Sequence, residues 1–139
     1  MKVDQKMGAW AEQHALIYLQ NLGYILVARN YYCRYGEIDL IVKNDSDLVF
    51  IEVKARSKTK YGQAIEVISF SKQKKIMRTA LHFLNKNLQF SHYFCRFDVI
   101  CFDFKHNFSK NVQQRFDDYV YDLNWIENAF TFEAEFINL

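Results

Sequence analysis

The 139-residue sequence contains no proline, only four glycines and only three cysteines. Without proline, the ends of helices and strands must be predicted from glycines and polar clusters, and no Pro/Ser-rich linker divides the chain. The glycines stand singly, which excludes a glycine-rich loop that cradles phosphate. We therefore expect a single domain over residues 1–139, with an aromatic and acidic C-terminal tail from about residue 119 to 139.

The cysteines are odd in number and widely spaced, and no C-x-x-C pair occurs. This pattern argues against a disulfide framework and against a zinc knuckle, and it favours a reducing compartment. No run approaches the ~20 apolar residues that a membrane span needs, and the first residues lack the apolar segment of a signal peptide. We expect a cytoplasmic protein.

Half of the residues are hydrophobic and 17% are aromatic, while the formal net charge is only +2. This composition is typical of a folded globular domain rather than a disordered chain. The charge is uneven, however, because residues 54–78 hold eight basic side chains and one acidic one, whereas residues 103–139 hold three basic and seven acidic ones. The basic segment is suited to an anionic partner, although a solvated loop and a lysine-rich helix would show the same pattern.

Hydrophobic periodicity predicts an α/β domain. The expected elements are a helix over residues 5–22 ended by Gly23, strands over 24–30, 37–43 and 48–54, a helix from a Ser71 cap to about residue 86, and a strand over 94–102. Short connections favour an antiparallel meander of the first three strands, and the helical crossover favours a parallel fourth strand. In the tail we expect a strand at 119–123 and a short helix at 125–130.

The second and third strands specify their own register. An even-numbered turn between them pairs positions that sum to 91, which places Ile38 opposite Val53, Leu40 opposite Ile51 and Val42 opposite Val49 on an apolar face. The same register places Asp39 opposite Glu52 on the other face, with Glu37 opposite Lys54. Ile41 and Phe50 share that second face, so we expect it to be covered rather than fully wet.

Asp39 and Glu52 would then have Cβ atoms about 5 Å apart, and at an effective dielectric near 20 their repulsion is about 3 kcal/mol. Either one carboxyl is protonated or a divalent cation such as Mg²⁺ or Mn²⁺ lies between them. Lys54 is placed to orient water or to stabilise an anionic transition state. The alternative is an ordinary salt-bridged outer face of a hairpin. Two acids and a lysine around a metal are typical of phosphodiester hydrolysis.

The segments Gly36 to Ile41 (GEIDLI) and Val49 to Arg56 (VFIEVKAR) resemble the uncharacterised bacterial YraN-like family, which is similar to PD-(D/E)XK nucleases and Holliday-junction resolvases. The resemblance covers roughly residues 8–100. It is also carried by Glu12, Ala15, Leu19, Gly23-Tyr24, Asn30, Tyr61-Gly62, Lys72, Ala80 and Arg96 to Val99. The proline of the nuclease motif is replaced here by Glu37-Ile38 before Asp39.

The resemblance implies a restriction-endonuclease-like three-layer α/β core: helix, three-strand antiparallel meander, helix and parallel strand, with a mixed central sheet. By the same analogy Asp39 is the first motif acid, Glu52 and Lys54 form the E-x-K element, and Glu12 is a helical acid that completes the metal site. For Arg96 and Asp98 we expect a structural ion pair.

These patterns lead to a hypothesis of a Mg²⁺- or Mn²⁺-dependent endonuclease-like protein acting on DNA, in branched or single-stranded form during repair or recombination. Asp39, Glu52 and Glu12 would hold the metal, and Lys54 would assist catalysis. The predicted nucleic-acid contacts are Arg56, Lys58, Lys60, Tyr61, Lys72 and Lys75. The alternatives are a non-catalytic nucleic-acid-binding module for a repair or recombination partner and an interaction protein that uses the aromatic tail, with a homodimer through that tail.

Overall fold

The computed structural model describes residues 3–58, 68–108 and 115–132. Its elements are α1 (Val3–Asn21), β1 (Ile25–Cys33), β2 (Gly36–Lys43), β3 (Asp47–Arg56), α2 (Phe70–Lys86), the short 3-10 helix η3 (Leu88–Phe90), β4 (Phe94–Phe104), the 3-10 helix η4 (Phe116–Asp118) and β5 (Tyr121–Phe130).

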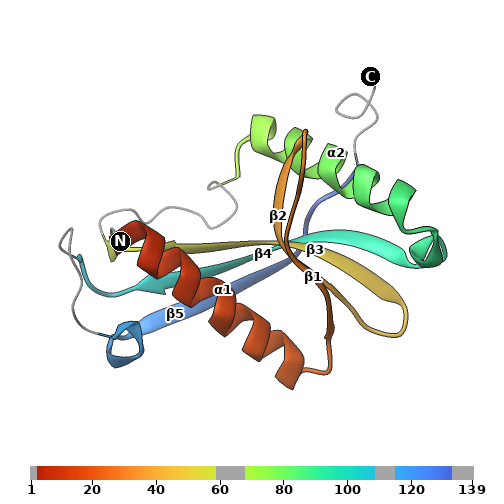
Figure 1. Ribbon diagram of the computed structural model, residues 1–139. Helices are drawn as coiled ribbons and strands as arrows, with labels where there is room; N and C mark the ends of the chain where they lie inside the picture. Colours follow the sequence, from red (N-terminus) through yellow and green to blue (C-terminus); the bar gives the residue numbers. More distant parts are fainter. Residues whose placement is uncertain (1–2, 59–67, 109–114, 133–139) are drawn as a thin grey trace.

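The strands form one mixed sheet in the order β1-β2-β3-β4-β5. β1, β2 and β3 make the antiparallel meander, β4 runs parallel to β3, and β5 returns antiparallel to β4. The helices α1 and α2 lie on either side of the sheet, and the β1–β2 hairpin rises beside α2 (Figure 1). The predicted three-layer, restriction-endonuclease-like α/β fold is therefore confirmed.

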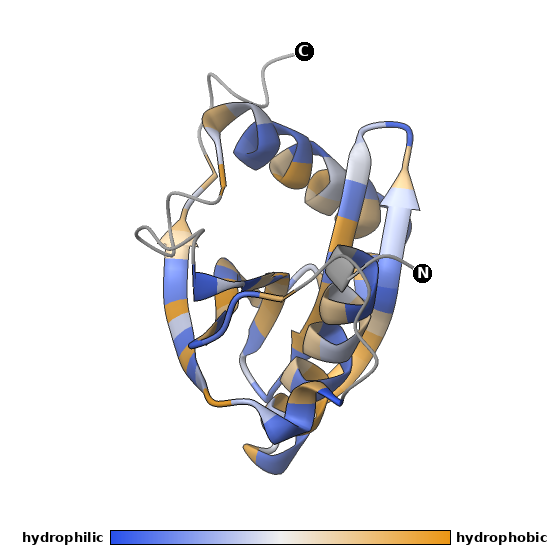
Figure 2. Cartoon of the chain, turned by 90° about the vertical axis from the view of Figure 1, so that its left-hand side faces the viewer, coloured by the Kyte–Doolittle hydropathy of each residue, from blue (hydrophilic) through white to orange (hydrophobic). Residues whose placement is uncertain are grey.

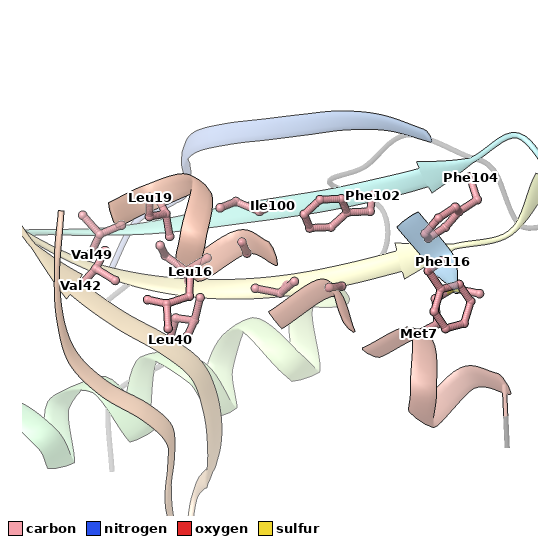
Figure 3. Packing of buried hydrophobic residues seen from close by; sticks show 14 residues of the cluster. Met7, Leu16, Leu19, Leu40, Val42, Val49, Ile100, Phe102, Phe104 and Phe116 are labelled. Carbon is pink, nitrogen blue, oxygen red and sulfur yellow. The ribbon is translucent and has the colours of Figure 1, made fainter. Parts of the chain in front are cut away.

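The core is divided by the sheet into two apolar clusters. On one face, side chains from α1 pack on alternate residues of β2, β3 and β4, including Leu40, Val49 and Phe102 (Figure 3). On the other face, α2 covers the intervening residues, such as Ile41 and Phe50. Hydrophobic and hydrophilic residues alternate along both helices, as expected for helices that pack one side against a sheet (Figure 2). The expectation that the face of Ile41 and Phe50 is covered is confirmed.

The two helices differ in how well their ends were predicted. At the end of α1, Gly23 has a φ of +95°, Tyr24 N donates to Leu19 O and Gly23 N donates to Gln20 O, both at 3.0 Å. This is the glycine cap expected there. At the start of α2, however, the cap is Ser69 and not Ser71, because the Ser69 hydroxyl accepts from Lys72 N.

The predicted register of β2 and β3 is confirmed for Leu40–Ile51 and for the pairs that follow toward the turn. The paired ladder ends at Leu40 and Ile51, so the expected pairings of Ile38, Asp39 and Glu37 with β3 do not form as regular rungs. Ile38 also packs in the α2 cluster, not on the face of Leu40. The two strands therefore separate at Asp39, where the site described below begins.

The tail residues 121–130 form strand β5, so the helix expected at 125–130 is wrong. Trp125 pairs with Ile100 and Ile126 pairs with Val99 along β4. Partly buried aromatics of the tail, among them Tyr121 and Trp125, pack against the α1 cluster. Sheet pairing overrides the local helical pattern because it completes the edge of β4 and buries these rings.

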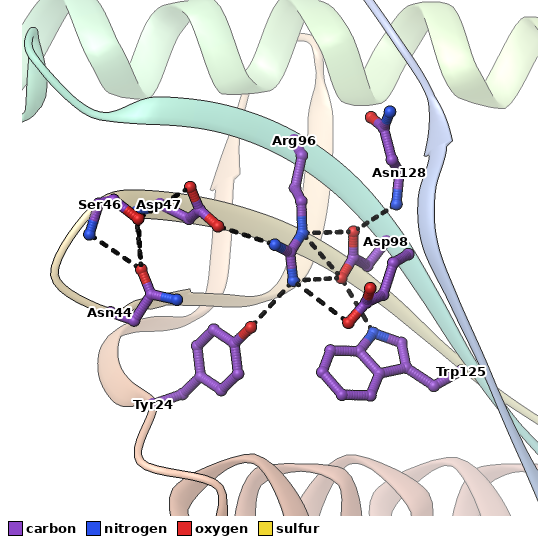
Figure 4. A network of polar contacts seen from close by, with 9 residues as sticks. Tyr24, Asn44, Ser46, Asp47, Arg96, Asp98, Trp125 and Asn128 are labelled. Atoms are coloured by element: carbon purple, nitrogen blue, oxygen red, sulfur yellow. Dashed lines mark hydrogen bonds and ion pairs between the residues drawn. The ribbon is translucent and has the colours of Figure 1, made fainter.

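A polar network joins the ends of several elements around Arg96 (Figure 4). Its guanidinium donates to Asp47 at 2.8 Å, to Tyr24 at 2.9 Å and to Asp98 at 3.1 Å. The expected Arg96–Asp98 ion pair is confirmed.

Among the described residues, neither helix is long and apolar enough to cross a membrane.

Candidate functional site

Asp39 and Glu52 line one pocket, of about 360 Å³, between the β1–β2 hairpin, the centre of the sheet and the start of α2. Asp39 comes from β2, and Glu52 comes from β3. The other lining residues are Gly36, Glu37, Ser69, Ser71, Lys72, Lys75 and Ile76. The structure thus places the two predicted acids on the same side of the sheet, under the first turns of α2.

Asp39 is oriented by the backbone of the neighbouring strand. Its Oδ2 atom accepts a hydrogen bond from Val53 N at 2.8 Å, in the place where a regular ladder would supply a carbonyl oxygen. Burial raises the pKa of Asp39, and the hydrogen bond from Val53 opposes that increase. The carboxylate is held in a defined direction, with its second oxygen atom left for other contacts.

Glu52 is the more buried of the two acids, with only 3% of its surface exposed. Burial, followed by repulsion from Asp39, raises the pKa of Glu52 to about 7. Its Oε2 atom lies 3.2 Å from Lys72 Nζ, whereas its buried Oε1 atom has no hydrogen-bond partner among the described residues. A buried carboxylate oxygen without a partner is costly, and it marks a place where a cation or a donor is missing.

Two lysines meet at the acids. Lys54 of β3 and Lys72 of α2 lie close enough for each to shift the pKa of the other. Burial, together with Lys72, lowers the pKa of Lys54. Burial also acts against the charge of Lys72, but the contacts with Glu52, Lys54 and Asp39 together outweigh burial and raise the pKa of Lys72. Lys54 therefore loses its proton more readily than Lys72 does.

Glu12 lies beside this cluster rather than inside it. With the Asn30 amide oriented to satisfy both acids, its nitrogen donates to Glu12 Oε1 at 2.9 Å and to Glu37 Oε1 at 3.3 Å. Burial and the nearby Asp39 raise the pKa of Glu12. Asn30 has a φ of +52°, a left-handed conformation that asparagine tolerates better than most residues. The Asn30 amide thus joins Glu12 of α1 to Glu37 of β2, and Glu12 is not among the residues that line the pocket.

The donor set fits a hard divalent cation with few protein ligands. Within residues 3–58, 68–108 and 115–132, no three His, Cys, Asp or Glu side chains converge as a complete metal cluster. Mg²⁺ is commonly held by one or two carboxylates, with water and substrate phosphate completing its coordination. Asp39 and the unpartnered Oε1 atom of Glu52 supply such a pair. The participation of Glu12 as a third ligand stays a prediction.

The predicted nucleic-acid contacts fall into three groups. Lys72 and Lys75 line the pocket, and Lys58, two residues after the end of β3, is exposed. Arg56 is a correction, because its guanidinium is 9% exposed and pairs with Asp103 at 2.7 Å. A buried, paired guanidinium is a structural group rather than a surface contact for a phosphate backbone. Lys60 and Tyr61 lie outside the described residues.

Sequence reasoning named Lys72 and Lys75 as nucleic-acid contacts but missed that the start of α2 closes the pocket over the two acids. Ser69 and Ser71 line the pocket, and Lys72 contacts Glu52 directly although 20 positions separate them in the sequence. The only signal was the cluster of serines and lysines at the start of a predicted helix, which we interpreted as a cap and a basic surface. The side chains of that cluster instead close the pocket over the acids.

Comparison with known sequences identifies relatives along nearly the whole chain. The profile of a family described as "Uncharacterised protein family UPF0102" matches residues 11–102. A UPF0102 protein of Acinetobacter baumannii strain AYE is 53% identical over 133 residues, which cover 96% of this chain and 100% of that protein. A UPF0102 protein of Legionella pneumophila strain Corby is 40% identical over 128 residues, covering 92% and 97% of the two chains.

Proposed function

This chain belongs to the UPF0102 family, and we propose that it is a Mg²⁺- or Mn²⁺-dependent, endonuclease-like hydrolase of DNA phosphodiester bonds. The observation that carries the proposal is the Glu52 carboxylate, which is 3% exposed and lies beside Asp39 and two lysines, with one oxygen that has no partner among the described residues. Burial of such a group is destabilising unless a ligand uses it. A divalent cation is the ligand that two adjacent carboxylates favour.

The residues of the pocket can divide the work of hydrolysis. The Val53 backbone holds Asp39 in place, and Asp39 and Glu52 would bind the cation. The cation, when bound, would act as a Lewis acid that stabilises negative charge on the phosphate and on the leaving oxygen. Lys54 Nζ, whose pKa is lowered by burial, would accept a proton from the attacking water. Lys75, in the pocket wall, would attract the phosphate.

DNA in branched or single-stranded form is the proposed substrate, because Lys58, Lys60, Tyr61, Lys72 and Lys75 offer phosphate contacts and one aromatic ring for stacking. The homodimer through the tail stays a prediction. The described tail aromatics, which include Tyr121, Trp125 and Phe130, pack within this chain's own clusters, so they give no support for a second copy.

Cleavage assays test the proposal directly. Purified protein is incubated with Mn²⁺, Mg²⁺ or EDTA and with linear duplex, single-stranded and four-way-junction DNA. We expect a divalent ion to support cleavage of at least one substrate. The cleavage rate of Glu52→Ala should be at least about 100-fold lower, because the variant lacks a cation ligand; this factor corresponds to about 2.7 kcal/mol of transition-state stabilisation. Asp45→Asn, which changes an exposed acid in the β2–β3 turn, should cleave like the wild type.

Binding assays on the same DNA panel separate catalysis from binding. We expect Glu52→Ala to bind DNA in EDTA about as well as the wild type does, while cleavage with a divalent ion is lost. Wild-type protein that binds these DNAs but cleaves none of them would contradict the hydrolase and favour the non-catalytic nucleic-acid-binding module. Protein that neither binds nor cleaves any of them would contradict both functions.

A further inference from the structure

Lys72 occupies an unusual position between the solvent and the buried acid. It lies in the first turn of α2, where its backbone N–H donates to the Ser69 hydroxyl at 3.1 Å. Its Nζ atom lies 3.2 Å from Glu52 Oε2, and the Lys72 side chain is 39% exposed, whereas that of Glu52 is 3% exposed. The lysine therefore reaches in from the surface and can leave without unpacking the core.

The contact uses the carboxylate that the proposed cation would need. Lys72 covers Oε2 of Glu52, and Oε1 has no partner within the described part of the chain. An ammonium group at 3.2 Å from a carboxylate and a divalent ion on the same carboxylate would repel each other at short range in a partly buried site. Binding of one therefore weakens binding of the other.

The position to which Lys72 would move is suited to a phosphate group. The pocket beside it is lined by Ser69, Ser71 and Lys75, and it adjoins the positive N-terminal end of the 17-residue helix α2. The Glu52 side chain, which is 3% exposed and whose Oε1 atom has no partner among the described residues, lines the same pocket and would place a cation beside a phosphate there. An anion held next to a bound cation would attract a released lysine.

We propose that Lys72 is an exchangeable counter-ion. It pairs with Glu52 while no divalent cation is bound, and it turns toward the pocket to hold a phosphate oxygen of the nucleic acid once a cation takes its place. This inference rests on the proposed function for the nature of the ligands, and it adds a coupling: divalent cation and DNA phosphate each favour the binding of the other through one side chain.

Calorimetric titration with Mn²⁺ alone tests the exchange without any cleavage. We compare wild type, Lys72→Met and Lys75→Met. Both variants remove one positive charge from the same pocket, but Lys75 makes no ion pair with an acid among the described residues, so their difference isolates the direct contact with Glu52. We expect Lys72→Met to bind Mn²⁺ at least about fivefold more tightly than Lys75→Met does, a coupling of ordinary size.

Equal or weaker Mn²⁺ affinity in Lys72→Met than in Lys75→Met would overturn the proposal. Lys72→Arg, which keeps the positive charge, should bind Mn²⁺ as the wild type does, and tighter binding in that variant would also count against the exchange. Circular dichroism and thermal unfolding establish that each variant is folded. If Lys72→Met does not fold, Lys72→Gln replaces it with the same expected result.

DNA affinity supplies the second half of the test. With Ca²⁺ as the divalent ion, we expect wild-type affinity for a short oligonucleotide to rise at least about fivefold relative to EDTA, and this rise to be largely absent in Lys72→Met. An equal rise in both proteins would overturn the role of Lys72 in the coupling. Wild-type protein that binds Mn²⁺ but cleaves no DNA would refute the hydrolase while leaving the exchange intact. Wild-type protein that binds no divalent ion would refute both.

Discussion

The Glu52 carboxylate is tolerated in the folded chain only with help from neighbouring cations. Its surface is 3% exposed, its partner Lys72 reaches one oxygen at 3.2 Å, and Asp39 repels it. By contrast, the buried side chains of Arg56 and Asp103 neutralise each other in an ion pair, which needs no ligand. At the scale of single residues, the difference between a functional group and a structural one is therefore whether its buried charge is fully satisfied.

The raised pKa of Glu52 makes stability depend on pH. The pKa is about 7 in the folded chain against an ordinary value of 4.5, so between these values the folded protein binds the proton more tightly than the unfolded chain does. The free energy of unfolding should therefore fall as pH rises through this range. In Glu52→Gln this fall should be absent. The free energy of unfolding of the variant should therefore rise by about 1–3 kcal/mol relative to that of the wild type between pH 4.5 and about pH 8.

Urea unfolding in EDTA at several pH values measures this effect. The quantity compared is the difference in the free energy of unfolding between Glu52→Gln and wild type, followed as the pH changes. A constant cost of the glutamine shifts this difference equally at every pH, so it does not affect the result. A difference that stays the same across the range would show that Glu52 does not titrate as expected. Added Mn²⁺ should stabilise the wild type and leave Glu52→Gln nearly unchanged.

At the scale of elements, the site depends on how closely the β1–β2 hairpin and the start of α2 approach each other. Gly36 lines the pocket, and a Cβ atom there would lie 3.3 Å from Thr79 Oγ1 and 3.4 Å from Lys75 Cβ. Glycine at this position, with a φ of +155°, permits the approach. The first turn of α2 is set by Ser69, so the cap fixes where Lys72 emerges.

Matched substitutions of the two serines test the cap. Ser69→Ala should lower the free energy of unfolding by about 1 kcal/mol, because it removes the hydroxyl that accepts from Lys72 N. Ser71→Ala changes an exposed residue inside the first turn, where alanine is favourable to the helix, so we expect no loss. Thermal or urea unfolding measures the stability of both variants. A larger loss of stability in Ser71→Ala than in Ser69→Ala would contradict the assignment of Ser69 as the cap.

At the scale of the whole molecule, Arg96 ties together parts that are distant in the sequence. Its guanidinium contacts Tyr24 after α1, Asp47 at the start of β3 and Asp98 on β4. Asp98 in turn accepts from Trp125 Nε1 on β5 at 2.9 Å. The network thus couples the edge strand β5 to the centre of the sheet and to the α1–β1 connection (Figure 4).

Removal of the central cation should destabilise the molecule as a unit. Arg96→Met leaves the fully buried Asp98 side chain without its cation, and breaking such a pair costs about 3–5 kcal/mol. Urea unfolding followed by tryptophan fluorescence and by circular dichroism should show one coincident transition at lower denaturant. Lys105→Met, which disrupts the exposed ion pair with Asp122, should change stability by less than about 1 kcal/mol, and an equal loss in both variants would contradict the central role of Arg96.

The sequence by itself determined the layered fold and the meeting of the two acids. Hydrophobic periodicity defined α1, α2 and the first four strands, and the alternation of apolar residues along β2 and β3 allowed one register only, which the Leu40–Ile51 pair confirms. These features depend on side chains that are neighbours within a helix or across one short turn. Such interactions are encoded locally, so a single sequence suffices to predict them.

Only the tertiary structure decided what surrounds the acids. Lys72 reaches Glu52 from a helix on the other side of the pocket, and Arg56 is withdrawn from the surface by Asp103, 47 positions away. Residues 125–130 join β4 as a strand despite their local helical pattern. In each case the outcome depends on burial and charge contributed by distant segments, which local patterns along the chain do not specify.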